Sequence, residues 1–392
     1  MTDIRNIYKK YQAQTFPSPS LLHVKSASGS YIKDYDDKEY LDFVAGVSAC
    51  SIGHCNKQVT TAVKNQINKY SHVMVYGEYI QDPQYKLAKL LADNLPESLS
   101  TSYFTNSGAE AIEGAIKLAK RINKRSEIIY CKDSYHGSTH GALSVMGNEE
   151  YKSNYRPLIP DCKQIIYNKL ESLEKITDKT SAVIVETIQG ASGFIEASQD
   201  FLNQIKKRCI VNNVLIIFDE IQTCFGRTGK LFGFQHTKIV PDILCIAKGM
   251  GGGYPIAAFI SSWENMNKLT HSPKLGHITT FGGHPIGCTA SYATLNYILN
   301  NNIIDSINEK EELFRKLLVH KKIKSISGKG LMISLDFHDS IETIRVVESC
   351  MKDGLLLFYF LFNDSSVRIT PPLTITNKEI VKGCKILLKN LD

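Results

Sequence analysis

One short segment, residues 241–255, constrains what this chain can fold into more than any other. The apolar run from Ile243 to Ala247 predicts a buried β-strand, and this strand ends directly at Lys248. Burial disfavours a charged ammonium and lowers the pKa of a lysine, which frees its amine to form a Schiff base with a carbonyl. The glycines that follow would let a planar ligand approach that amine closely. A solvated lysine just past a core strand is the commoner arrangement, so the functional hypothesis needs other residues that converge on Lys248.

The chain around this segment alternates predicted strands and helices. Apolar runs at 128–131, 182–187, 214–218 and 243–247 predict strands, with helical spacing of apolar residues between them. This alternation is typical of an α/β protein whose mostly parallel sheet is covered on both faces, and ligands of such sheets bind at the carboxyl ends of the strands. At 392 residues we expect two domains. The large domain is assigned to residues 51–294, and a smaller α/β domain is assigned to both termini, 1–50 and 295–392.

Further elements are predicted on either side of this core. Thr376 and Glu379 form a capping box at the start of a final helix. Apolar spacing predicts a hairpin at 31–44, helices at 57–70, 83–94, 295–318 and 341–353, and strands at 331–337 and 355–362.

Composition narrows the partners and the compartment. The 46 basic and 39 acidic residues give a net charge of +7 that is spread along the chain, which suits an anionic cofactor or substrate better than nucleic acid. The ten cysteines are scattered without a C-x-x-C pair and predict reduced thiols in a cytoplasmic protein. Residues 1–16 have no signal-peptide core, and the longest apolar run is too short to span a membrane. Cys50, His54 and Cys55 lack further ligands at suitable spacing, so we expect no metal.

Two polar groups are predicted at the strand ends near Lys248. Ser107, Gly108 and Ala109 open a helix, and a small-residue turn at a helix N-terminus can bind a phosphate through free backbone N–H groups. Asp219 ends the strand 214–218 and could keep a heteroaromatic nitrogen protonated, with Gln222 close to the same ligand. An ordinary N-cap and an ordinary strand-terminal cap are the simpler alternatives for these motifs.

Two further side chains complete the candidate set. Tyr135 follows the strand 128–131 and could stack on a planar ring. Arg368 lies in an alternating strand, from which a guanidinium can bind a carboxylate through two hydrogen bonds. An exposed strand arginine is the alternative.

These motifs together resemble the class III, pyridoxal-phosphate-dependent aminotransferases of fold type I, the group of acetylornithine, ornithine, 4-aminobutyrate and ω-amino acid aminotransferases. The resemblance covers nearly the whole chain. It rests on N-S-G-A-E-A at 106–111, Y-H-G at 135–137, V-E-T-I-Q-G at 185–190, F-D-E-I-Q-T at 218–223, G-R-T-G-K-L-F at 226–232, A-K-G-M-G-G-G at 247–253 and T-T-F-G-G-H-P at 279–285.

The resemblance implies the cofactor pyridoxal 5′-phosphate, a fold type I α/β architecture and a role for each motif. Lys248 would form the Schiff base and move the proton, and Asp219 would face the pyridine nitrogen. The other roles follow by position: Ser107, Gly108 and Ala109 as the phosphate loop, Tyr135 as the stacking ring, Gln222 near the ring hydroxyl, Arg368 on the substrate carboxylate, Glu186 as an electrostatic support in the substrate site, and Thr280 on the phosphate of a neighbouring subunit, which implies a homodimer with shared active sites.

The reaction implied is a ping-pong transfer of an amino group from an amino acid or ω-amine donor to a 2-oxo acid. Three positions depart from the family pattern: Ser138 replaces an arginine, Ala191 replaces a glutamate, and Val47 stands where ornithine aminotransferases have an aromatic residue. The first two departures, Ser138 and Ala191, predict a short monocarboxylic acceptor. An aminomutase of the same family is one alternative. A dinucleotide-dependent dehydrogenase is another, but the glycines at 249–253 do not fit G-x-G-x-x-G.

Overall fold

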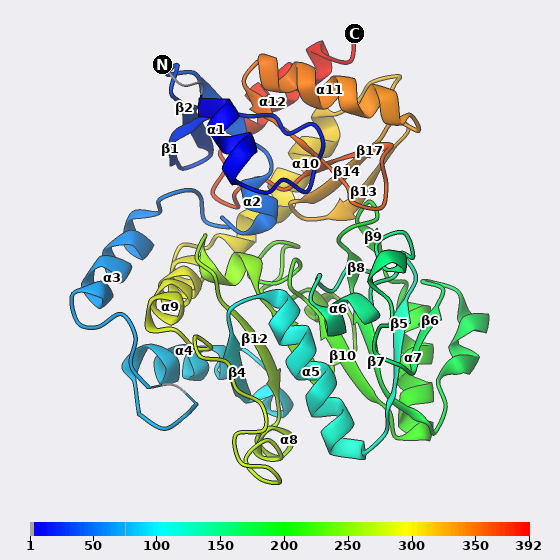
Figure 1. The fold of residues 1–392 in the computed structure, drawn as a ribbon. Helices are drawn as coiled ribbons and strands as arrows, with labels where there is room; N and C mark the ends of the chain where they lie inside the picture. The colour runs from blue at the N-terminus through cyan, green and yellow to red at the C-terminus, as the bar shows by residue number, and fades with distance from the viewer. Residues whose placement is uncertain (1–3, 75) are drawn as a thin grey trace.

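The computed structural model describes residues 4–74 and 76–392, and its centre is a seven-stranded sheet (Figure 1). The strands β5, β6, β7, β10 and β11 are parallel, whereas β12 runs antiparallel to β11 and β4. This sheet confirms the predicted α/β class. In sheet order the strands are β4 (Thr101–Thr105), β12 (Ala257–Ser261), β11 (Ile243–Ile246), β10 (Leu215–Asp219), β7 (Thr180–Glu186), β5 (Glu127–Cys131) and β6 (Cys162–Ile165).

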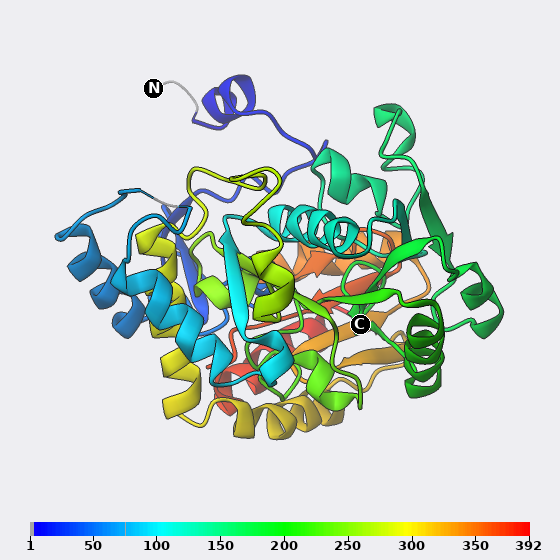
Figure 2. The same ribbon diagram turned by 90° about the horizontal axis from the view of Figure 1, so that it is seen from below.

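Helices cover both faces of this sheet because its central strands are apolar on both sides. Helix α5 (Gly108–Asn123) packs on one face with a cluster that includes Ile128, Ile184 and Ile217, the alternate residues of three strands. Helix α7 (Gln199–Asn212) packs on the other face, which belongs to the main hydrophobic core. Figure 2 shows these two helices on opposite sides of the sheet. The remaining helices of this half are α3 (Lys57–Ile67), α4 (Asp82–Ala92), α6 (His140–Ser144), α8 (Trp263–Asn267) and α9 (Pro285–Asn300).

The two ends of the chain meet in the upper half of Figure 1. Strand β15 (Leu355–Leu356) pairs in parallel with β3 (Glu39–Asp42), so one sheet contains strands from both termini. This shared sheet supports the division that the sequence predicts, and we propose a large domain of residues 51–294 and a smaller domain of residues 1–50 and 295–392. The other elements here are α1 (Ile4–Tyr11), β1 (Val24–Ser28), β2 (Tyr31–Asp34), α2 (Ala45–Ser48), α10 (Ile307–Leu317), β13 (Ser325–Lys329), β14 (Met332–Asp336), α11 (Ser340–Lys352), β16 (Phe358–Tyr359), β17 (Ser366–Ile369) and α12 (Asn377–Lys389).

Two predicted elements differ from the observed ones. The helix predicted at 295–318 is two helices, because α9 begins at Pro285 and ends at Asn300, and α10 begins at Ile307. The strand predicted at 355–362 is also divided, since β15 pairs with β3 while β16 pairs with β17 in a different sheet. The hairpin β2–β3 and the capping box of Thr376 and Glu379 are confirmed. Within the described residues, no helix has both the length and the apolar character that crossing a bilayer requires.

Candidate active site

Lys248 lies where the sequence predicts it, two residues beyond Ile246, the last residue of β11. It is partly buried and lines a cavity of about 490 Å³. Burial lowers the pKa of its ammonium. Among the described residues, no acceptor forms a hydrogen bond with this amine. Its backbone has φ +44°, a left-handed conformation that is uncommon for residues other than glycine. The structure therefore presents an amine that is easily deprotonated to an open cavity.

The same cavity is lined by the predicted phosphate loop and the predicted stacking ring. Ser107, Gly108 and Ala109 form one wall at the start of α5, and Tyr135 forms another. Ser107 is the N-cap of α5, because its hydroxyl accepts a hydrogen bond from the N–H of Glu110 at 3.3 Å. Ser107 can cap the helix while this segment also binds a phosphate, because the first N–H groups of a helix have no acceptor within the helix. A Cβ on Gly108 would lie 2.7 Å from Ile221, so the close approach here requires glycine.

Asp219 ends β10, and its carboxylate is 5% exposed. One oxygen accepts a hydrogen bond from the N–H of Ile221 at 2.9 Å, and the other lies 2.7 Å from Nδ1 of His136. Burial opposes a charge on His136, but the Asp219 carboxylate outweighs burial and raises the pKa of the imidazole. His136 is buried, and within the described part of the chain its Nε2 has no hydrogen-bond partner. Sequence motifs assign His136 no role, and its place between Tyr135 and Gly137, shortly after a strand, is the only sequence signal for it.

Glu186 ends β7 and lies beside Asp219 in the sheet register. Both of its carboxylate oxygens accept backbone hydrogen bonds, from Tyr135 N–H at 3.1 Å and from Gly190 N–H at 2.7 Å. Burial raises the pKa of this carboxyl group. Glu186 therefore fixes the backbone of the predicted stacking ring, which is a contact that the sequence did not reveal.

Gln222 lies at the edge of this group of polar residues. Its Nε2 donates a hydrogen bond to the hydroxyl of Ser48 at 3.2 Å. A Cβ on Gly190 would lie 2.4 Å from Oε1 of Gln222 and 3.3 Å from Oε2 of Glu186. Both side chains therefore pack directly against Gly190. Ser48 was not predicted as part of the site.

Arg368 lies in β17 and is 6% exposed, which excludes the exposed-arginine alternative. Its guanidinium carbon lies 4.7 Å from the centre of the Phe360 ring and 5.9 Å from that of Phe194. Burial lowers the pKa of this guanidinium to about 10, and its Nε has no hydrogen-bond partner among the residues that the structure describes. After burial, the positive charge of Arg368 also lowers the pKa of Lys248, so the guanidinium is near enough to the ammonium to repel its charge.

Like Asp219, Glu186, Gln222 and Arg368, Thr280 does not line the cavity of Lys248. It is exposed on the segment that leads to α9. The adjacent Thr279 accepts a hydrogen bond from the side chain of Asn106, which precedes the phosphate loop, at 3.1 Å. Thr279 also lines a second cavity of about 870 Å³ on the surface of the molecule.

The fold and this site together define an α/β enzyme that can hold an aldehyde cofactor on a strand-end lysine. The family model described as Aminotransferase class-III matches residues 12–391, and the chain belongs to this family. Pyridoxal 5′-phosphate is the cofactor of class III aminotransferases, and the residues of this chain fit it. Lys248 would hold its aldehyde, Asp219 its ring nitrogen and the start of α5 its phosphate.

Relatives and solved structures agree with this assignment. The chain is 37% identical to an acetylornithine aminotransferase of Caldanaerobacter subterraneus, over 97% of this chain and 96% of that protein. It is 36% identical to an acetylornithine aminotransferase of Archaeoglobus fulgidus, over 97% and 98% of the two chains. The fold matches ornithine aminotransferase from Toxoplasma gondii with a TM-score of 0.91 at 28% identity, over 99% of this chain and 94% of that chain.

Proposed function

We propose that this class III aminotransferase transfers an amino group from an ornithine-like, acetylornithine-like or 4-aminobutyrate-like donor to a 2-oxo acid in two half-reactions. Pyridoxal phosphate, when bound, supplies an electron sink for the electrons released at the donor carbon. The Nζ of Lys248 takes up and returns the proton at that carbon. The Asp219 carboxylate would keep the ring nitrogen of the cofactor protonated, and Tyr135, which lines the same cavity as Lys248, would stack on the ring.

The state of Lys248 supports this function most strongly. Its amine faces a cavity, its pKa is lowered by burial, and it has no hydrogen-bond acceptor among the described residues. A lysine kept only for stability would be expected to pair with a carboxylate or to reach solvent. The nearest buried carboxylates, Asp219 and Glu186, instead bind His136 and backbone N–H groups. The lysine is therefore left available for covalent chemistry.

We further propose that the acceptor is a short 2-oxo acid with one carboxylate. Arg368 is buried, flanked by aromatic rings and not paired with a carboxylate, so it can bind a substrate carboxylate without first breaking an ion pair. The backbone carbonyl of Ala191 accepts a hydrogen bond from Phe362 at 3.0 Å, and the side chain of Ala191 offers no charge to compete for Arg368. The hydroxyl of Ser138 lies 3.2 Å from that of Tyr135 and carries no charge for a second substrate carboxylate.

A panel of amino donors assayed against pyruvate and 2-oxoglutarate tests both proposals. We expect the wild type to use pyruvate at least as well as 2-oxoglutarate. Ser138→Arg should shift kcat/KM towards 2-oxoglutarate by roughly ten- to a hundred-fold, the value of one charge-assisted contact. The matched control is Ser153→Arg, outside the cavity lining. A strong wild-type preference for 2-oxoglutarate would contradict the acceptor proposal. If the donor is isomerised and no 2-oxo acid is required, the protein is an aminomutase instead.

We also propose that the active unit is a homodimer in the cytoplasm. Large apolar side chains are exposed around the second cavity, where a second copy would bury them: Tyr79, Ile80, Tyr85, Trp263, Leu275 and Ile278. The exposed Thr280 is close to this surface in the chain and would reach the phosphate of that copy. All ten cysteines are free thiols, which suits a reducing compartment.

A further inference from the structure

A turn beside the active site is held in an unusual backbone conformation. Ala45, Gly46, Val47 and Ser48 have φ values of +49°, +59°, +58° and +69°, so four consecutive residues are left-handed. The left-handed conformation is unfavourable for every residue other than glycine, and a β-branched residue such as Val47 is an outlier in this region. Surrounding contacts must therefore stabilise this turn, which we call the left-handed turn.

The left-handed turn and the residues that flank it contact three parts of the active site. Ser48 accepts the hydrogen bond from Gln222 at 3.2 Å. Ser51, just beyond the turn, donates a hydrogen bond at 2.8 Å to the carbonyl of Gly249, the residue after Lys248. Thr370, two residues beyond Arg368, donates a hydrogen bond at 3.0 Å to the carbonyl that precedes the turn, that of Val44. The position of the turn thus affects all three neighbourhoods together.

A buried ion pair holds the start of the turn. The Asp42 side chain is 2% exposed, and its Oδ1 accepts hydrogen bonds from the N–H groups of Val44 at 2.7 Å and Ala45 at 3.0 Å. Its Oδ2 lies 2.7 Å from Nε2 of His54. Two groups face the His54 imidazole, the Asp42 carboxylate and the Cys50 thiol, and together they raise the pKa of His54 to about 10. The imidazolium thus keeps the carboxylate charged and oriented at neutral pH.

We propose that Asp42 and His54 are positioning residues for transamination. They fix the left-handed turn so that Ser48 orients Gln222 and Ser51 holds the backbone of Gly249 beside Lys248. This inference rests on the proposed function, because it assigns the turn a role in holding the cofactor and the reacting lysine. Neither residue is expected to touch the substrate.

The test compares Asp42→Asn with Asp34→Asn in the holoenzyme. Asp34 is a matched control: it is buried in the same sheet and accepts hydrogen bonds from the N–H groups of Asp36 at 3.0 Å and Lys38 at 2.9 Å, and from the Tyr40 hydroxyl at 2.8 Å. We expect Asp42→Asn to lower kcat by about tenfold or more, because small misplacements of reacting groups are costly. It should also release pyridoxal phosphate faster on dialysis, with little change in KM for the 2-oxo acid. Asp34→Asn should lower only Tm.

The proposal is overturned if both variants lose Tm equally and keep kcat and cofactor retention within about twofold of each other. If Asp42→Asn does not fold, His54→Gln with the same measurements decides in its place, since it removes the charge but leaves the Asp42 hydrogen bonds to the backbone. Retention of pyridoxal phosphate is measured without substrate. A wild type that binds the cofactor and does not transaminate therefore contradicts the proposed function, while the retention data still decide the role of the turn.

Discussion

Three buried titratable side chains set the charge beneath the cavity of Lys248. Glu186 and Asp219 are neighbours at the ends of adjacent strands, and Nδ1 of His136 lies 2.7 Å from the carboxylate of Asp219. Like charges so close are tolerated because Glu186 also accepts two backbone hydrogen bonds, and because burial raises its pKa. This arrangement leaves Asp219 as the carboxylate whose charge is supported from behind, which is what a partner of a protonated pyridine needs.

Asp219→Asn tests this role at the residue scale. The amide keeps the shape of the carboxylate but cannot hold a positive charge on the ring nitrogen, so we expect kcat to fall by at least about 100-fold while the cofactor still binds. Glu220→Gln is the matched control, because Glu220 is equally buried and its carboxylate binds the N–H groups of Gly233 and Phe234 away from the cavity. A kcat within a few fold of wild type for Asp219→Asn would remove it from this role.

Sequence motifs revealed the residues at strand ends but not their partners. Lys248, Asp219 and Tyr135 follow apolar runs, so their places at one edge of the sheet could be predicted. The contact of His136 with Asp219 joins residues 83 positions apart, and it depends on the order of strands in the sheet. The contact of Ser48 with Gln222 joins residues 174 positions apart and needs a left-handed turn that no local pattern indicates.

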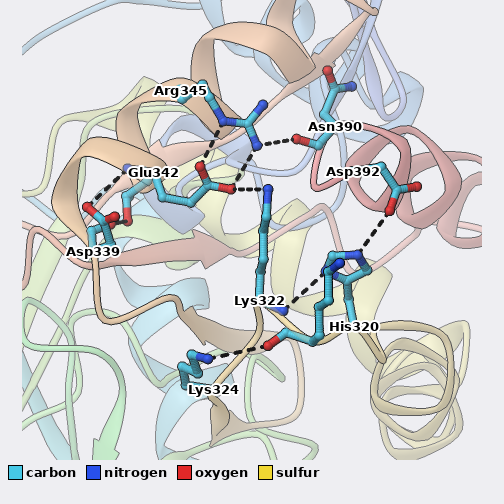
Figure 3. A network of polar contacts seen from close by, with 10 residues as sticks. His320, Lys322, Lys324, Asp339, Glu342, Arg345, Asn390 and Asp392 are labelled. Carbon is cyan, nitrogen blue, oxygen red and sulfur yellow. Dashed lines mark hydrogen bonds and ion pairs between the residues drawn. The ribbon is translucent and has the colours of Figure 1, made fainter.

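At the scale of elements, local signals located most helices and strands, and tertiary pairing decided the rest. The capping box of α12 lies within four residues and was visible in the sequence. The division of residues 355–362 was not visible, because a continuous apolar run gives no sign that its halves pair with different sheets. The C-terminal helices are further joined by a polar network (Figure 3), in which Glu342 of α11 binds Arg345 and Lys322, and Arg345 binds the carbonyl of Asn390 at the end of α12.

This network predicts a pH-dependent contribution to stability. The hydrogen bonds of Arg345, followed by those of Lys322, lower the pKa of Glu342 from 4.5 to about 2. Because the folded pKa is lowered, the stabilisation is present above pH 4.5 and is lost as the pH falls towards 2. Glu342→Gln should therefore lower Tm by about 1–2 °C at pH 7, as expected of a partly exposed ion-pair network. The difference from wild type should shrink below pH 4.5.

Differential scanning fluorimetry from pH 7 to pH 3.5 measures this effect. Glu348→Gln, a change at an exposed position on the same helix, is the control and should leave Tm unchanged. A difference between Glu342→Gln and wild type that stays constant across this range would contradict the assigned linkage.

At the scale of the whole molecule, the described residues leave large apolar side chains exposed on two parts of the surface. Helix α1 buries none of its residues, and Ile4, Ile7, Tyr8 and Tyr11 are exposed on it. More apolar side chains surround the second cavity near Thr280. The sequence alone could not place these surfaces, because composition and periodicity do not tell whether an apolar residue faces its own core or another copy.

We expect Lys248 to act in a site that Thr280 of a second copy completes, and mixing two inactive variants tests this shared site. Lys248→Ala should be inactive, and Thr280→Ala should lose activity when pyridoxal phosphate is limiting. In a heterodimer of the two, one site has both Lys248 and Thr280. After subunit exchange of an equal mixture, we predict recovery to about one quarter of wild-type activity, since half of the dimers are mixed and each has one intact site.

Thr279→Ala is the matched control, because Thr279 contacts Asn106 in its own chain and should give no recovery when mixed with Lys248→Ala. Native mass spectrometry confirms that mixed dimers form. Activity that rises to about one quarter with Thr280→Ala alone is the predicted result. If mixed dimers form and the activity remains at the average of the two parent variants, Thr280 does not complete the site of a second copy.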